Sequence, residues 1–134
     1  MNNNAICCCG QLRIETEGEP LVHAVCHCSN CKKRTGSAFG VSAYFKDTQI
    51  INTVGKAHCY EIKNERHQKR YFCKNCGTTL YWKVSVLPGI TGVAAGCFEN
   101  PIPEPTHNLL NENACDWIEL PETWKSEVTR RDFR

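Results

Sequence analysis

The stretch Cys26-His27-Cys28-Ser29-Asn30-Cys31 places three thiols within six residues. Thiolates bind soft cations such as Zn²⁺, and a C-x-C-x-x-C run can direct three sulfurs to one point about 2.3 Å away. The fourth coordination position is then left to a distant side chain, water or a substrate. The stretch therefore predicts a metal site whose fourth ligand decides between a structural and a catalytic role.

Two cysteine pairs lie far apart in the sequence, Cys7-x-Cys9 near the start and Cys73-x-x-Cys76 beyond the middle, and each is followed by a glycine. Together they would complete a tetrahedral zinc site with four thiolates, which is closed and therefore structural. Such a site would fasten the N-terminal strand to a strand far along the chain. It would thereby compensate for the limited core of a small β-domain.

Two alternative groupings of these cysteines must be considered. Cys73 and Cys76 could form a thioredoxin-like redox pair, but that motif leads into a helix, whereas residues 78–82 have the pattern of a strand. Cys28 and Cys31 could instead join Cys73 and Cys76 as the two knuckles of a zinc ribbon. The spacing permits this grouping, although it leaves the thiols of Cys7, Cys9 and Cys26 without a role.

The composition indicates one domain, residues 1–134, with a modest hydrophobic core. The formal net charge of +2 indicates no strong preference for nucleic acid or for acidic membranes. The chain has eleven cysteines and no recognisable signal peptide, so we expect a reduced, cytoplasmic zinc protein rather than a disulfide scaffold. No apolar run approaches the roughly 18 residues of a membrane span.

Alternating apolar and polar residues predict an all-β fold with short helical turns. The clearest strand runs from Phe39 to Phe45, where apolar residues repeat at a spacing of two. We expect residues 47–53 and 56–62 to form a hairpin, residues 29–34 a knuckle or helical turn, and residues 122–128 a short helix. The remaining expected strands cover residues 12–16, 21–25, 68–72, 79–86 and 90–97.

Three cysteine motifs occur in a fixed order along the chain. They are Cys7-x-Cys9-Gly10, Cys26-His27-Cys28-x-x-Cys31-x-Lys33-x-x-Gly36-Ser37-x-Phe39 and Arg70-x-Phe72-Cys73-x-x-Cys76-Gly77. In these motifs the chain resembles the glutathione-dependent formaldehyde-activating enzyme family, which also includes centromere protein V. The resemblance extends through Gly96, the proline-rich stretch to His107, and Trp117 with Leu120-Pro121.

The resemblance covers nearly the whole chain and implies an all-β fold of the β-tent type, with two zinc ions per chain. It implies a carbon–sulfur lyase that condenses formaldehyde with glutathione to S-(hydroxymethyl)glutathione. Glutathione is then a co-substrate, and the partners are a small-molecule thiol and an aldehyde. It assigns a structural zinc to Cys7, Cys9, Cys73 and Cys76, and a catalytic zinc to Cys26, Cys28 and Cys31.

Charge balance points to cations beside the second zinc. Three thiolates give a zinc site a net charge of −1, and a bound substrate thiolate lowers it to −2. Lys32, Lys33 and Arg34 follow the last ligand and are candidates for this charge and for the carboxylates of glutathione, although a solvated basic turn is an equal interpretation. Alternative functions are a non-catalytic zinc module that binds protein or nucleic acid, and a thiol sensor or zinc store.

The remaining cysteines and two histidines carry weaker expectations. Family members commonly carry Gly-x-Leu-Asp where this chain has Gly96-Cys97-Phe98-Glu99, and the Cys97 sulfur would close the second zinc site if it reached the metal. His27 is expected to point away from the metal, in a supporting or surface position, and His107 to tie down the proline-rich segment. By spacing, buried free thiols are expected at Cys8, Cys59 and Cys115.

Overall fold

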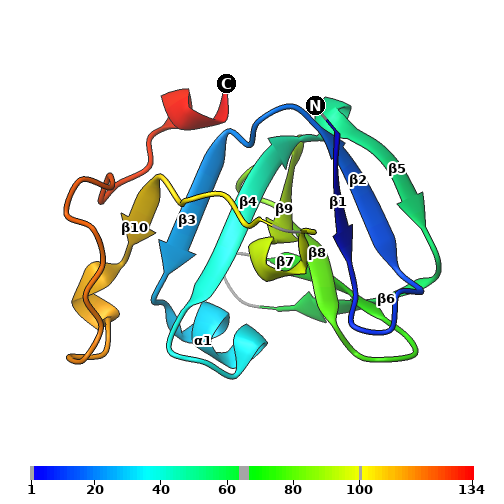
Figure 1. Ribbon diagram of the computed structural model, residues 1–134, viewed down its shortest axis with the longest axis horizontal. Helices are drawn as coiled ribbons and strands as arrows, with labels where there is room; N and C mark the ends of the chain where they lie inside the picture. Colours follow the sequence, from blue (N-terminus) through cyan, green and yellow to red (C-terminus); the bar gives the residue numbers. More distant parts are fainter. Residues whose placement is uncertain (1, 64–66, 100) are drawn as a thin grey trace.

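The computed structural model describes residues 2–63, 67–99 and 101–134. Within these residues the strands form two sheets (Figure 1): a seven-stranded sheet in the order β10-β3-β4-β9-β8-β7-β6 and a three-stranded sheet in the order β1-β2-β5. All strand pairs are antiparallel except β10 with β3. The predicted all-β fold is therefore confirmed.

The elements agree with most of the predicted ranges. The strands are β1 (Asn2–Ile6), β2 (Arg13–Glu17), β3 (Val22–Cys26), β4 (Gly40–Lys46), β5 (Ile50–Val54), β6 (Ala57–Ile62), β7 (Gln68–Cys73), β8 (Thr79–Val84), β9 (Ile90–Ala94) and β10 (His107–Leu109). One α-helix, α1 (Ser29–Thr35), follows β3, and four 3₁₀ turns cover Asp47–Gln49, Ala95–Cys97, Asn111–Asn113 and Arg130–Phe133. No helix in the described part of the chain is long and apolar enough to cross a membrane.

The two faces of the large sheet have different roles. Successive side chains of a strand point to opposite faces. On β4, Ala43 and Phe45 are buried in the core that lies between the two sheets, together with Leu12 and Ile14 of the small-sheet region. The intervening Ser42 and Tyr44 line a pocket instead. The strand period thus divides the large sheet into a core face and a pocket face.

The expected hairpin between residues 47–53 and 56–62 is not formed. β5 pairs with β2 in the small sheet, whereas β6 pairs with β7 at the edge of the large sheet. Gly55 lies at the crossing between the sheets with φ +94°, and a side chain there would overlap the backbone carbonyl of Gln11. A glycine is needed here because a distant backbone segment approaches closely. In the sequence the same glycine has the pattern of a hairpin turn, which explains the wrong prediction.

The helix expected at residues 122–128 is also absent. The Lys125 backbone N–H donates to the Thr106 carbonyl at 2.9 Å, and its carbonyl accepts from the Asn108 N–H at 2.8 Å. These bonds make a parallel bridge between Lys125 and His107 at the start of β10. Backbone groups that would form helical bonds are thus used in tertiary pairing, which holds the C-terminal segment in an extended form.

Candidate functional site

The first cysteine group joins the two sheets at one end of the molecule. Cys7 and Cys9 lie in the turn between β1 and β2, and Cys73 and Cys76 in the turn between β7 and β8. Their four sulfurs lie within 4.8 Å of one another. The structure therefore brings together the two pairs that are 64 residues apart in sequence and separates them from Cys28 and Cys31, against the zinc-ribbon grouping.

The geometry of this group fits a tetrahedral zinc. The Cys9 sulfur lies 3.6 Å from the sulfurs of both Cys7 and Cys73. A disulfide requires about 2.05 Å, whereas tetrahedral sulfurs at 2.3 Å from a zinc are about 3.8 Å apart. The backbone N–H of Leu12 donates to the Cys7 sulfur at 3.2 Å, a contact of the kind that stabilises metal-bound thiolates.

Cys76 and Cys73 of this group have very different pKa values. The Thr78 hydroxyl and backbone N–H lower the pKa of Cys76 to about 5. A backbone hydrogen bond from Cys76 favours the thiolate of Cys73, but burial and the neighbouring Cys9 and Cys7 thiols outweigh it and raise the pKa of Cys73 to about 11. One thiolate is thus ready to bind a cation, whose charge would deprotonate its neighbours.

The second group forms at the end of β3 and the start of α1. The sulfurs of Cys26, Cys28 and Cys31 lie within 4.8 Å of one another. Cys28 caps α1, because its sulfur accepts the Cys31 backbone N–H at 3.3 Å. A cap residue and the third residue of a helix turn toward one another, which explains why the C-x-x-C spacing brings these two thiols together.

Like-charge repulsion within the second group calls for a cation. The neighbouring thiols of Cys26 and Cys28, helped by burial, raise the pKa of Cys31 above its ordinary value, and the Cys28 thiol raises that of Cys26. Three thiolates at this separation are stable only around a positive ion. The donor set of three sulfurs therefore fits zinc, and the described residues contribute no fourth cysteine, histidine or carboxylate to this group.

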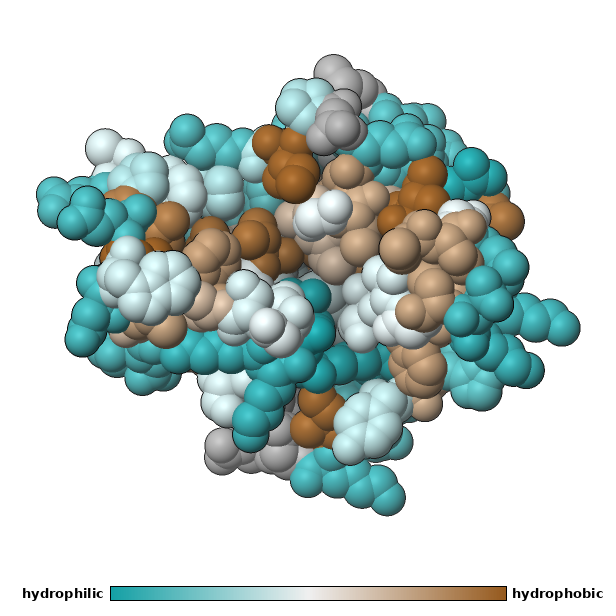
Figure 2. Space-filling model, turned by 60° about the horizontal axis from the view of Figure 1, so that its bottom comes forward, coloured by the Kyte–Doolittle hydropathy of each residue, from teal (hydrophilic) through white to brown (hydrophobic). Residues whose placement is uncertain are grey.

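A pocket of about 380 Å³ adjoins the second group. It lies on the pocket face of the large sheet, against side chains from β3, β4, β7 and β8 and against the C-terminal segment. Figure 2 turns the end that carries α1 toward the viewer and shows apolar residues in a broken band across the face between hydrophilic margins. The three thiols are thus reached from an open, partly apolar pocket, as a small-molecule site requires.

Arg34 is the basic residue of α1 that lines this pocket. Its guanidinium carbon lies 4.2 Å from the centre of the Trp82 ring, and Nη2 is buried without a hydrogen-bond partner. Burial lowers the pKa of Arg34, an effect that the nearby Cys31 and Tyr44 oppose. A guanidinium remains charged under such a shift, so Arg34 places an unpaired cation beside the three sulfurs.

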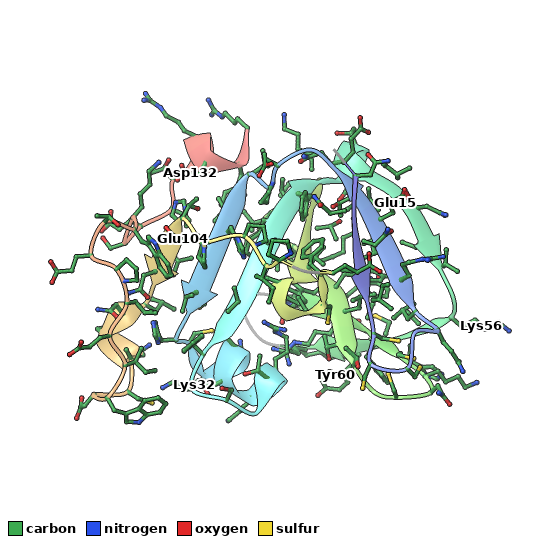
Figure 3. The ribbon with its side chains drawn as sticks, in the orientation of Figure 1. Glu15, Lys32, Lys56, Tyr60, Glu104 and Asp132 are labelled. Carbon is green, nitrogen blue, oxygen red and sulfur yellow. The ribbon has the colours of Figure 1, made fainter. Side chains whose placement is uncertain are left out.

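The two candidate lysines lie elsewhere. The Lys32 ammonium donates to the Asn113 carbonyl at 2.8 Å (Figure 3), and Lys33 is exposed; neither lines the pocket. Arg70 on β7 does line it, and donates to the Asn30 carbonyl at 3.1 Å and to Gln68 Oε1 at 2.7 Å. Burial lowers the pKa of Arg70, and the proximity of Arg34 lowers it further.

Helical spacing could have singled out Arg34 from the three basic candidates on the sequence alone. Residues three apart on a helix share a face, and Arg34 follows Cys28 and Cys31 at that interval. Lys32 and Lys33 lie about 100° and 200° away around the helix from Cys31. Arg70 carries no comparable signal, because its place on the pocket face depends on which way β7 is turned in the sheet.

Gly92 makes room for the ring that supports Arg34. Trp82 is buried opposite Gly92 on β9, and a side chain on Gly92 would lie 2.6 Å from Cε2 of the indole. We expect Gly92→Ala to displace Trp82 and to lower the free energy of unfolding by about 1–3 kcal/mol, as overpacking does. Because the Arg34 guanidinium lies over this ring, it is also expected to shift relative to the three sulfurs.

Thermal unfolding measures the effect of Gly92→Ala on stability. Gly96→Ala is the matched control, because a side chain on Gly96 would meet no atom within 4 Å. The control is expected to change the free energy of unfolding by no more than about 0.5 kcal/mol. Equal behaviour of the two variants would contradict the supporting role of Gly92.

The structure also decides the sequence expectations about the other cysteines. Cys97 belongs to neither sulfur group and packs against the core, so it does not close the second site. Cys8 and Cys59 are exposed and Cys115 is half-buried, so the expectation of buried thiols is wrong. Cys8 occupies the turn between two members of the first group, and Cys59 lies on β6 at a sheet edge, where side chains meet solvent.

His27 and His107 are both buried. The Nε2 atom of His27 lies 2.7 Å from Asn108 Oδ1, and the His27 backbone N–H donates to the Leu109 carbonyl. The surface position considered for His27 is therefore wrong. Through these two hydrogen bonds, His27 attaches the cysteine motif to β10. His107 pairs with β3 and contacts Thr106 at 2.7 Å, in accord with the expected anchoring of the proline-rich segment.

The fold and its two sulfur groups define a small all-β protein with two candidate metal sites. The profile of the glutathione-dependent formaldehyde-activating enzyme matches residues 2–118. The chain therefore belongs to this family, as its cysteine motifs predicted.

Curated relatives are similar over part of their length. A protein of Emericella nidulans named "Putative glutathione-dependent formaldehyde-activating enzyme" is 29% identical over 80 residues, which are 60% of this chain and 41% of that protein. A Schizosaccharomyces pombe protein named as an uncharacterised lyase is 30% identical over 76 residues, which are 57% of this chain and 53% of that protein. The match thus spans about half the length of these relatives.

A solved structure is also similar. The crystal structure of a Rhodobacter sphaeroides protein has a TM-score of 0.60 and 23% identity, and the match covers 75% of this chain and 91% of that one. At this identity the similarity establishes a shared fold.

Proposed function

We propose that this protein is a zinc-dependent carbon–sulfur lyase that joins glutathione to formaldehyde at the pocket beside Cys26, Cys28 and Cys31. The thiol sulfur forms a bond to the aldehyde carbon and the π bond of the carbonyl breaks, which leaves a carbon–oxygen single bond. The thiol proton is transferred to the oxygen. The observation that carries the proposal is the convergence of three thiols and two arginines without ion-pair partners, among the described residues, on one pocket.

A zinc held by these three sulfurs would lower the pKa of an incoming thiol and so supply the nucleophile at neutral pH. Arg34 would balance the negative charge of the four sulfurs and bind a substrate carboxylate at the pocket wall. Arg70, fixed by Asn30 and Gln68, would bind another anionic group of the substrate. Both arginines hold the thiol in place, which converts a reaction of two molecules into a positioned one.

Tyr44 supplies a hydroxyl group on the same pocket wall. Burial raises the pKa of Tyr44, so the phenol stays protonated at neutral pH. A protonated phenol can donate a hydrogen bond to the oxygen that gains negative charge when the sulfur attacks the aldehyde. The pocket therefore offers groups for the thiol, for the carboxylates and for the aldehyde oxygen.

The proposal is tested by NMR exchange spectroscopy on glutathione and formaldehyde with the zinc-loaded protein. The protein is expected to accelerate their interconversion with S-(hydroxymethyl)glutathione, and a rate equal to the uncatalysed reaction would contradict the lyase proposal. That result would favour the alternative, a non-catalytic zinc module that binds protein or nucleic acid.

Arg34→Gln is expected to weaken glutathione binding about tenfold or more, because it removes a charged partner from a half-buried site. Lys33→Gln is the matched control: it removes the same charge from the neighbouring, exposed position of α1. Titration calorimetry measures both dissociation constants. Equal affinities of the two variants would show that general positive charge, rather than Arg34, attracts the substrate.

A further inference from the structure

The C-terminal segment 119–134 lies beyond the residues that match the family profile, yet it forms part of the pocket. Ser126, Glu127 and Val128 line the pocket together with the three thiols and both arginines. Val128 also lines an adjoining groove together with Val86 and Leu87 of the turn after β8. This wall of the pocket therefore lies outside the residues that the family profile matches.

The segment is fixed on both sides of these three residues. Before them, Lys125 is paired with β10 through hydrogen bonds of 2.9 and 2.8 Å to Thr106 and Asn108. After them, the Phe133 ring meets the edge of the Tyr44 ring at 5.8 Å between centres. Asp132 lies near the upper end of β10 (Figure 3), 3.9 Å from His107 Nε2. These contacts on both sides hold residues 126–128 in their position at the pocket.

The pocket is lined by charged side chains of both signs. Glu127 is the acidic side chain among the described residues that line the pocket, and it has no ion-pair partner in the described part of the chain. Arg34 and Arg70, which lie close enough to repel one another, carry the positive charge. The C-terminal segment is attached at β10, one edge of the large sheet, whereas Arg70 belongs to β7 near the other edge.

A pocket with separated cations and a carboxylate is complementary to a zwitterion. Carboxylates of a ligand would bind at the arginines, and an ammonium group would bind at Glu127 through charge-assisted hydrogen bonds. Glutathione carries two carboxylates and one ammonium group, and other peptidic or amino-acid thiols share this pattern. A simple thiol such as 2-mercaptoethanol has neither charge and offers the pocket its sulfur alone.

We propose that Glu127 is an ammonium-binding residue that makes this protein selective for thiols with both a carboxylate and an α-ammonium group. The inference rests on the proposed function for the identity of the thiol site. It adds a substrate-recognition subsite carried by a segment outside the matched region.

The test compares binding of glutathione and of N-acetylglutathione, which lacks the ammonium group, to the full zinc-loaded chain by calorimetry or NMR titration. Wild type is expected to prefer glutathione by about five- to twentyfold, since the pair is charge-assisted but partly exposed to solvent. Glu127→Gln is expected to abolish this preference while its affinity for N-acetylglutathione stays that of wild type. Glu122→Gln, an exposed residue of the same segment that does not line the pocket, is expected to keep the preference.

The outcomes separate the two proposals. A Glu127→Gln variant that retains the wild-type preference would overturn the ammonium site, whatever the exchange rate. Glutathione binding with the expected selectivity but without accelerated exchange would overturn the lyase proposal and support the ammonium site. If glutathione does not bind wild type at all, both are overturned.

Discussion

Cys31→Ser is expected to reduce the acceleration of glutathione–formaldehyde exchange by about 100-fold or more, because a lost ligand affects a metal site at least as strongly as a lost supporting residue does. Cys31 is half-buried on α1, and its sulfur lies within 4.8 Å of the sulfurs of Cys26 and Cys28. With two thiolates remaining, the site would hold zinc weakly and leave the substrate thiol in its protonated form. NMR exchange spectroscopy measures the rate, and elemental analysis gives the zinc content.

The control for this prediction is Cys115→Ser. Cys115 is half-buried like Cys31 but belongs to neither sulfur group. We expect it to keep two zinc ions per chain and the wild-type rate. The melting temperature of Cys31→Ser is expected to change little compared with loss of the first site, because the second group does not join the two sheets. An exchange rate of Cys31→Ser within about threefold of wild type would exclude a catalytic role for this site.

Cys9→Ser is expected to have the largest effect on stability. The first sulfur group connects the β1–β2 turn of one sheet with the β7–β8 turn of the other, and the binding free energy of a structural zinc contributes directly to folding. Loss of one ligand should lower the melting temperature by more than about 10 °C and reduce the zinc content from two ions per chain to one. Scanning calorimetry and elemental analysis measure the two quantities.

Cys8→Ser is a closely matched control, since it changes the adjacent and equally exposed thiol, which lies outside the sulfur group. Its melting temperature and zinc content should equal those of wild type. Because Cys9 is itself exposed, a fall in stability of Cys9→Ser cannot be ascribed to a disturbed core. Two retained zinc ions and an unchanged melting temperature in Cys9→Ser would refute the structural role of this group.

The candidate site was partly predictable because its ligands follow local rules. Cys26, Cys28 and Cys31 are adjacent in sequence, so a strand end and a helix cap are enough to bring their sulfurs together. Arg34 follows from the same helical period. The positions of Arg70 and Glu127 in the pocket were not predictable, because each residue reaches the site through pairing of a segment that is distant in sequence.

The sequence by itself determined the strand alternation, the cysteine spacing and hence the fold class and family, since each depends on the period of a strand or on ligands a few residues apart. Only the tertiary structure decided that β5 and β6 enter different sheets, that Lys125 pairs with the start of β10, and that Glu127 lines the same pocket as the two arginines. The physical reason is that strand pairing and packing depend on which arrangement of the whole chain buries the apolar faces and gives every buried backbone N–H and C=O group a hydrogen bond. Local propensity limits the possible pairings but does not select one of them.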